Sequence, residues 1–141
     1  MRPSRAWLAA ASVALVLVLA GCAIFGRSGG RQDRFARPGS PRPSPSGAYI
    51  ASVVPGPPEN GVDTLVVVIT DQSGHEVFRD DDAYSTRHGV GVTWLSDRDQ
   101  LWILSADVGH SFVEIRDGRW AKVDITPETS ASVPGEIASL D

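Results

Sequence analysis

Short apolar stretches rich in β-branched and aromatic residues recur between Gly47 and Ile125, each about the length of a β-strand. Residues 65–70 are almost continuously apolar, a pattern typical of a strand buried on both faces. In residues 90–94 apolar side chains alternate with glycine and threonine, which indicates a strand with one buried face. Further strands are expected at residues 53–54, from residue 77, and at residues 101–104, 113–116 and 120–125.

Turn-forming residues separate these stretches at residues 71–74, at residues 96–99 and at Asp117-Gly118. The Asp-Gly pair is the strongest turn signal, because a type I′ hairpin turn needs positive φ at both central positions. No segment after residue 26 keeps a helical period over three turns. We therefore predict an all-β domain, an antiparallel meander of about seven strands arranged as a sandwich or a half-open barrel.

The N-terminus has a different character. Arg2 and Arg5 precede an uncharged apolar run that extends from Trp7 to Leu19. This run of about 14 residues is shorter than the roughly 20 that a membrane-spanning helix needs. Residues 1–21 are therefore predicted to be a helical secretory signal peptide.

The tetrapeptide Leu19-Ala20-Gly21-Cys22 resembles the lipobox of bacterial lipoproteins. The resemblance implies a diacylglyceryl group on the Cys22 thiol, cleavage just before Cys22, and further acylation such as palmitate on its new amino group. It also implies a membrane lipid as partner and a location on the extracytoplasmic side of the cell membrane. The alternative is an ordinary signal peptide with a coincidental cysteine. Cys22 is the only cysteine, so the chain can form no internal disulfide.

Residues 22–46 are predicted to be a disordered linker, because they are rich in Gly, Pro, Ser and Arg and poor in large apolar residues. The β domain is expected to span residues 47–126, and residues 127–141 to form a flexible tail. The linker contains five arginines and one aspartate, which gives it a net charge of +4. Two interpretations of this charge are open: the linker is attracted to anionic lipid headgroups, or it is simply a soluble spacer.

The domain itself is acidic. From Gly47 onward, the chain contains six basic and sixteen acidic residues, which gives a net charge of −10. Nothing in such a domain would neutralise phosphates, so nucleic acid is not an expected partner.

Residues 44–51 resemble the Ser-Pro-Asp-Gly-x-Tyr hairpin of TolB and WD40-like β-propellers, and residues 94–103 echo it. A propeller needs at least four blades, and this chain could form at most two. The same stretches also resemble small uncharacterised β lipoproteins with a Ser-Pro-x-Gly-x-Tyr start and a Trp-Leu-x-Asp motif. That resemblance implies a location and a fold but no activity.

Candidate chemistry is sparse. His75, His88 and His110 fall at expected turns, where they are either exposed loop residues or, with the run Asp80-Asp81-Asp82, ligands of a metal ion. Their spacing matches no ligand motif, and the aspartates lack the pattern of a calcium loop, so no metal or other cofactor is expected. The sequence also contains no nucleophile elbow and no phosphate loop, and we predict no catalytic residues.

Aromatic residues are the remaining candidates. Trp94 and Trp102 are expected in the core, while Trp120, next to a hairpin turn, is the one expected to be partly exposed and available to a protein partner. The sequence thus favours a non-enzymatic binding module at the cell envelope. The alternatives are an inhibitor of a basic cell-wall hydrolase such as lysozyme, or a small enzyme with a His/Asp site.

Overall fold

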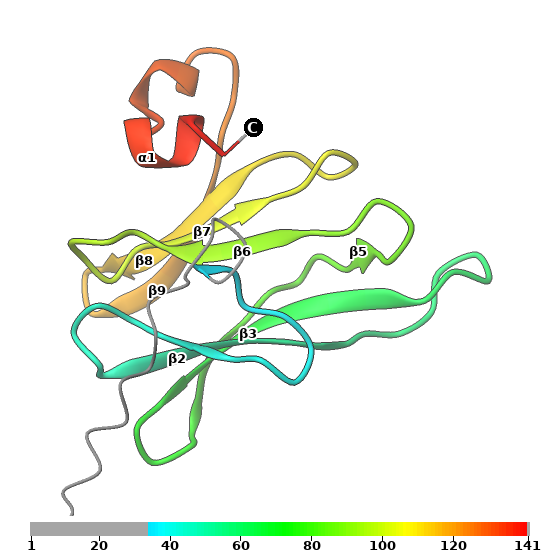
Figure 1. Ribbon diagram of the computed structural model, residues 1–141, viewed down its shortest axis with the longest axis horizontal. Coiled ribbons are helices and arrows are strands. Elements are labelled where there is room, and N and C mark those ends of the chain that lie inside the picture. The colour runs from blue at the N-terminus through cyan, green and yellow to red at the C-terminus, as the bar shows by residue number, and fades with distance from the viewer. Residues whose placement is uncertain (1–33, 141) are drawn as a thin grey trace, which may run out of the picture.

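The computed structural model describes residues 34–140, which form two antiparallel β-sheets with almost no helix (Figure 1). The first sheet has five strands in the order β1-β2-β3-β4, with β5 also paired to β3, and the second has four in the order β6-β7-β8-β9. The strands are β1 (Arg42–Pro43), β2 (Tyr49–Pro55), β3 (Thr64–Asp71), β4 (Glu76–Arg79), β5 (Tyr84–Ser85), β6 (Gly91–Trp94), β7 (Leu101–Leu104), β8 (Ser111–Arg116) and β9 (Arg119–Asp124).

The predicted all-β class is confirmed. The seven longer strands match the expected apolar stretches, and the two added strands, β1 and β5, have only two residues each. The Asp117-Gly118 turn is confirmed as well, because both residues have positive φ, 50° and 74°. The predicted signal helix lies outside the described residues.

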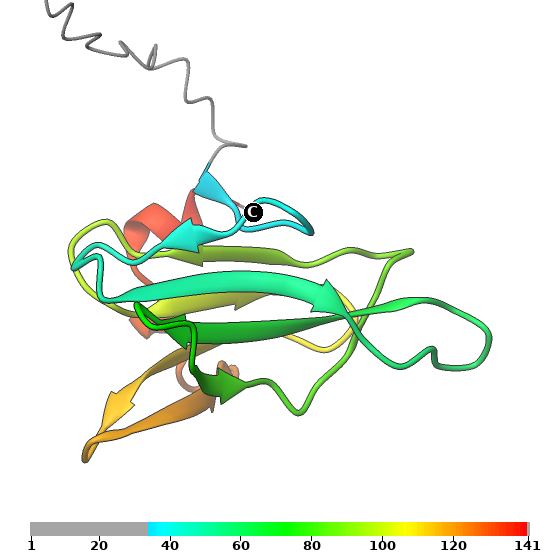
Figure 2. The ribbon, with the colours of Figure 1, turned by 90° about the horizontal axis from the view of Figure 1, so that it is seen from below.

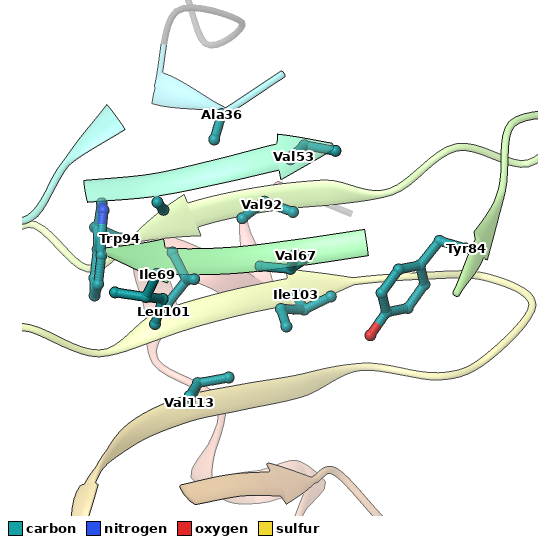
Figure 3. Packing of buried hydrophobic residues seen from close by; sticks show 11 residues of the cluster. Ala36, Val53, Val67, Ile69, Tyr84, Val92, Trp94, Leu101, Ile103 and Val113 are labelled. Carbon is teal, nitrogen blue, oxygen red and sulfur yellow. The ribbon is translucent and has the colours of Figure 1, made fainter. Parts of the chain in front are cut away.

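The main core lies between the two sheets (Figure 3). Four consecutive residues of β3, Val66 to Ile69, are buried, as expected for a strand covered on both faces. Val67 and Ile69 meet the inward side chains of the second sheet, among them Leu101 and Ile103. The β8–β9 hairpin crosses the long strands β2 and β3 at an angle (Figure 2).

The folded part begins earlier than the expected boundary at Gly47. The Ala36 amide donates to the Val92 carbonyl of β6 at 2.7 Å, and Ala36 is buried in the core. Shortly afterwards β1 pairs with β2, so residues 36–43 connect the edges of both sheets. Gly91 lets the Phe35 ring lie close to β6, since a Cβ at this position would be 3.1 Å from that ring. Residues 36–43 have the composition of a linker, so composition alone did not predict that long-range pairing holds them.

The C-terminal residues also differ from the flexible tail that we expected for residues 127–141. The short helical segments η2 (Ser130–Ser132) and α1 (Gly135–Ala138) lie over the outer face of the second sheet (Figure 1). Ile137 of α1 is 1% exposed and packs with Leu95 and Trp102. This second apolar cluster explains why β7 is buried on both faces.

We expect Ile137→Ala to lower the free energy of unfolding by about 2–4 kcal/mol, because it removes a buried side chain from this cluster. The measurement is urea denaturation of the full chain in non-ionic detergent. Ile115→Ala is the matched control, since Ile115 is 44% exposed on β8. Equal effects of the two substitutions would mean that the C-terminal segment does not cover the sheet in solution.

Candidate functional site

A hollow of about 420 Å³ lies where β1, the end of β6 and α1 come together. We call it the Arg42 hollow. Two prolines, Trp94 and Leu95 form apolar walls, and two arginines and one glutamate supply charge. The lining residues are Arg34, Arg42, Pro43, Pro45, Thr93, Trp94, Leu95, Ser96 and Glu136.

Arg34 makes three hydrogen bonds on one side of this hollow. Its Nε donates to the Thr93 hydroxyl at 2.9 Å, and its Nη2 donates to the Trp94 carbonyl at 3.0 Å and to the Glu136 carboxylate at 3.2 Å. Glu136 in turn accepts a hydrogen bond from the Ser96 amide. Partial burial opposes ionisation of Glu136, but the Ser96 and Arg34 hydrogen bonds outweigh it and lower the pKa of Glu136.

Arg42 is held differently. Its backbone pairs with Ala51 of β2, and its carbonyl accepts a hydrogen bond from the Trp94 indole at 3.0 Å. Both sheets therefore fix the position of its Cα. Its Nε is buried and has no hydrogen-bond partner, which is costly for a polar group.

A charged cluster connects the two sheets on another side of the domain. Lys122 of β9 donates to Asp80 at 2.8 Å, to Asp82 at 2.6 Å and to the Tyr84 hydroxyl at 3.0 Å. The Tyr84 hydroxyl donates to Asp80 at 2.6 Å, and the Asp80 side chain is fully buried. We call these four residues the Lys122 network.

Lys122 and Tyr84 of this network keep their protons at neutral pH. Burial alone would lower the pKa of Lys122, but the hydrogen bonds to Asp80, Asp82 and Tyr84 outweigh burial and raise it. Burial and the neighbouring Asp80 raise the pKa of Tyr84. A protonated lysine and a protonated tyrosine, each donating to a carboxylate, serve neither as a general base nor as a nucleophile. The arrangement is suited to holding the two sheets together.

We expect the free energy of unfolding to fall as the pH rises above about 10. The ordinary pKa values are 10.0 for tyrosine and 10.5 for lysine, so the unfolded chain releases both protons before the folded chain does. Folding is thus favoured below these values and loses this contribution above them. Urea titrations from about pH 8 to about pH 11 measure the slope, which Tyr84→Phe should reduce. If the slope of the free energy of unfolding against pH is the same in Tyr84→Phe, Tyr84 is not a source of this pH dependence.

The three aspartates of the run Asp80-Asp81-Asp82 differ in burial: Asp80 is buried, Asp81 is exposed and Asp82 is half-buried. Asp80 accepts hydrogen bonds from Tyr84 and Lys122. One feature of the sequence could have drawn attention to this network: Lys122 is the only lysine in an arginine-rich chain.

Trp120 lies in a half-buried position on β9 and packs against the main core. Its ring meets the Tyr49 ring edge-on with centroids 4.9 Å apart, and the Trp94 ring at 6.2 Å. Trp94 and Trp102 are buried, as we expected. A role of Trp120 in partner binding remains a prediction.

The structure brings two of the three histidines to one place. His88 and His110 line a hollow of about 340 Å³ together with Phe35 and Leu140. His75 lies apart and exposed in the turn between β3 and β4. Within residues 34–140, no group of three or more His, Cys, Asp or Glu side chains is arranged to hold a metal ion.

The lipidation site predicted at Cys22 lies outside the described residues. In the part of the chain that the structure covers, no helix has the length and apolar character needed to cross a membrane.

Comparisons with known proteins gave no relative. No model of a protein family matches the chain, and neither a curated protein nor a solved structure matches it.

Proposed function

We propose that this protein is a lipid-anchored, non-enzymatic binding module on the extracytoplasmic side of a bacterial cell membrane. The observation that carries the proposal is the tetrapeptide Leu19-Ala20-Gly21-Cys22 at the end of a short apolar run that follows two arginines. Two or three acyl chains hold a protein at a bilayer far more firmly than one, because each buried CH₂ contributes about 0.8 kcal/mol.

Binding rather than catalysis is supported by the kinds of contact in the domain. The polar side chains of the Lys122 network are hydrogen-bonded to one another. The Arg42 hollow combines apolar walls with a few polar groups, which is the usual composition of a ligand site.

Fractionation of envelopes tests the anchored location. The full-length protein should stay with membranes through high-salt and alkaline washes and enter solution with non-ionic detergent. A protein that washes free without detergent would contradict the proposal. Turnover of a substrate by the purified protein would contradict its non-enzymatic part.

A second candidate function is inhibition of a basic cell-wall hydrolase. A hollow of about 190 Å³ is lined by four aspartates (Asp80, Asp81, Asp82 and Asp124) beside Arg79 and Lys122, and the domain from Gly47 onward has a net charge of −10. Such a surface would steer a basic partner, and salt would weaken that steering. Inhibition of lysozyme at low salt that declines at moderate salt would support this function, and no inhibition at low salt would remove it.

A further inference from the structure

We infer that the Arg42 hollow binds a carboxylate group that is carried next to an apolar side group, as in the C-terminal residue of a peptide. This inference rests on the proposed binding function and names the chemistry of its ligand.

The Nε of Arg42 is a buried donor without a hydrogen-bond partner. A buried donor without a partner is uncommon in folded proteins and calls for an explanation. The Arg42 Nε is such a donor, and its residue lines an accessible hollow. Arg42 is also anchored through its backbone to β2 and through its carbonyl to Trp94. Arg42 is therefore fixed at its Cα, and its buried Nε lacks an acceptor.

Arg34 lines the same hollow and differs from Arg42 in having an internal partner. Arg34 receives the internal carboxylate of Glu136 at 3.2 Å, so its charge is compensated. Among the residues that line the hollow, Glu136 is the only acid, against two arginines. The hollow thus carries a local excess of one positive charge in a domain that is strongly acidic. Guanidinium groups bind carboxylates through two parallel hydrogen bonds, and a ligand carboxylate would give Arg42 what Glu136 gives Arg34.

The lining beside Arg42 is apolar. Pro43 follows it directly, and Pro45, Trp94 and Leu95 complete apolar walls around the opening. An apolar side chain adjacent to the carboxylate would cover these walls and exclude water from the ion pair. A free inorganic anion would leave them uncovered. The apolar lining therefore favours a ligand whose carboxylate is carried by an apolar residue.

The test uses the full-length protein in non-ionic detergent micelles and N-acetyl-leucyl-leucine as probe. The reporter is the NMR signal of the Trp94 indole N–H, because this group donates to the Arg42 carbonyl. We expect a saturable shift with the free acid and binding weaker by about tenfold or more with the C-terminal amide, as expected for loss of a charge-assisted hydrogen bond. This comparison needs no variant. Inorganic phosphate is titrated separately to represent a lipid headgroup.

Variants sharpen the assignment. Arg42→Gln should abolish the shift, and Arg119→Gln, which changes an exposed arginine outside the hollow, should leave it unchanged. Any of four results would overturn the inference. The acid and the amide could bind equally, or the shift could persist in Arg42→Gln. Phosphate could bind more tightly than the acid, or no saturable shift could be seen. These results leave the envelope fractionation untouched, so failure of the ligand assignment is distinguishable from failure of the anchored location.

Discussion

Replacing Lys122 with methionine is expected to lower the free energy of unfolding by about 3–5 kcal/mol, because it leaves a buried carboxylate without its cation. The Asp80 side chain is fully buried, and Lys122 is its cationic partner at 2.8 Å. Methionine keeps most of the length of the lysine stem but supplies no donor. The loss is a large share of the about 5–15 kcal/mol that stabilises a typical domain. Urea denaturation of the full chain in non-ionic detergent measures it.

Two further variants separate charge from packing. The double variant Asp80→Asn with Lys122→Met removes both charges, and it should recover a large part of the lost stability, since replacing a buried ion pair by neutral groups is often tolerated. Arg119→Met removes an exposed charge from the same strand and should change stability by less than about 0.5 kcal/mol. A Lys122→Met effect as small as that of Arg119→Met would show that the network contributes nothing to the joining of the sheets.

Replacing Cys22 with serine is expected to abolish acylation completely and to leave residues 1–21 attached. The reason is chemical, because the serine hydroxyl differs from the thiol by a single atom but is not the acceptor of the lipobox pathway. The measurement is incorporation of labelled palmitate, together with the apparent mass of the chain. Wild-type protein should be labelled and shortened, and the serine variant should be unlabelled and longer.

Serine at Cys22 leaves residues 34–140 unchanged, so the variant should keep the stability and the ligand binding of the folded domain. Labelling that persists in Cys22→Ser would place the acyl group on another residue and would contradict the lipobox assignment. An alanine substitution at Ser28, within the same linker, is the control and should alter neither labelling nor processing.

Local patterns in the sequence were sufficient for the class of fold. The run at residues 65–70 became the buried strand β3, and Asp117-Gly118 became the turn between β8 and β9. Both features depend on neighbouring residues alone. Strand periodicity and turn chemistry are local properties, and they can therefore be recognised in a single sequence.

The contacts that the sequence did not reveal join residues that are far apart. Asp80 and Lys122 are separated by 42 positions, and Arg34 and Glu136 by 102. Residues 34–46 have the composition of a linker, yet they are ordered by pairing with both sheets. The unsatisfied Nε of Arg42 likewise follows from packing, which composition does not encode. The candidate ligand site could therefore be found only in three dimensions.

The intact mass of the protein purified from membranes tests the lipid anchor most directly. We expect a chain that begins at Cys22 and carries a diacylglyceryl group on its sulfur, with an acyl group on its amino nitrogen where that step occurs. A mature chain that begins at another residue, or one that begins at Cys22 with a free thiol, would contradict it.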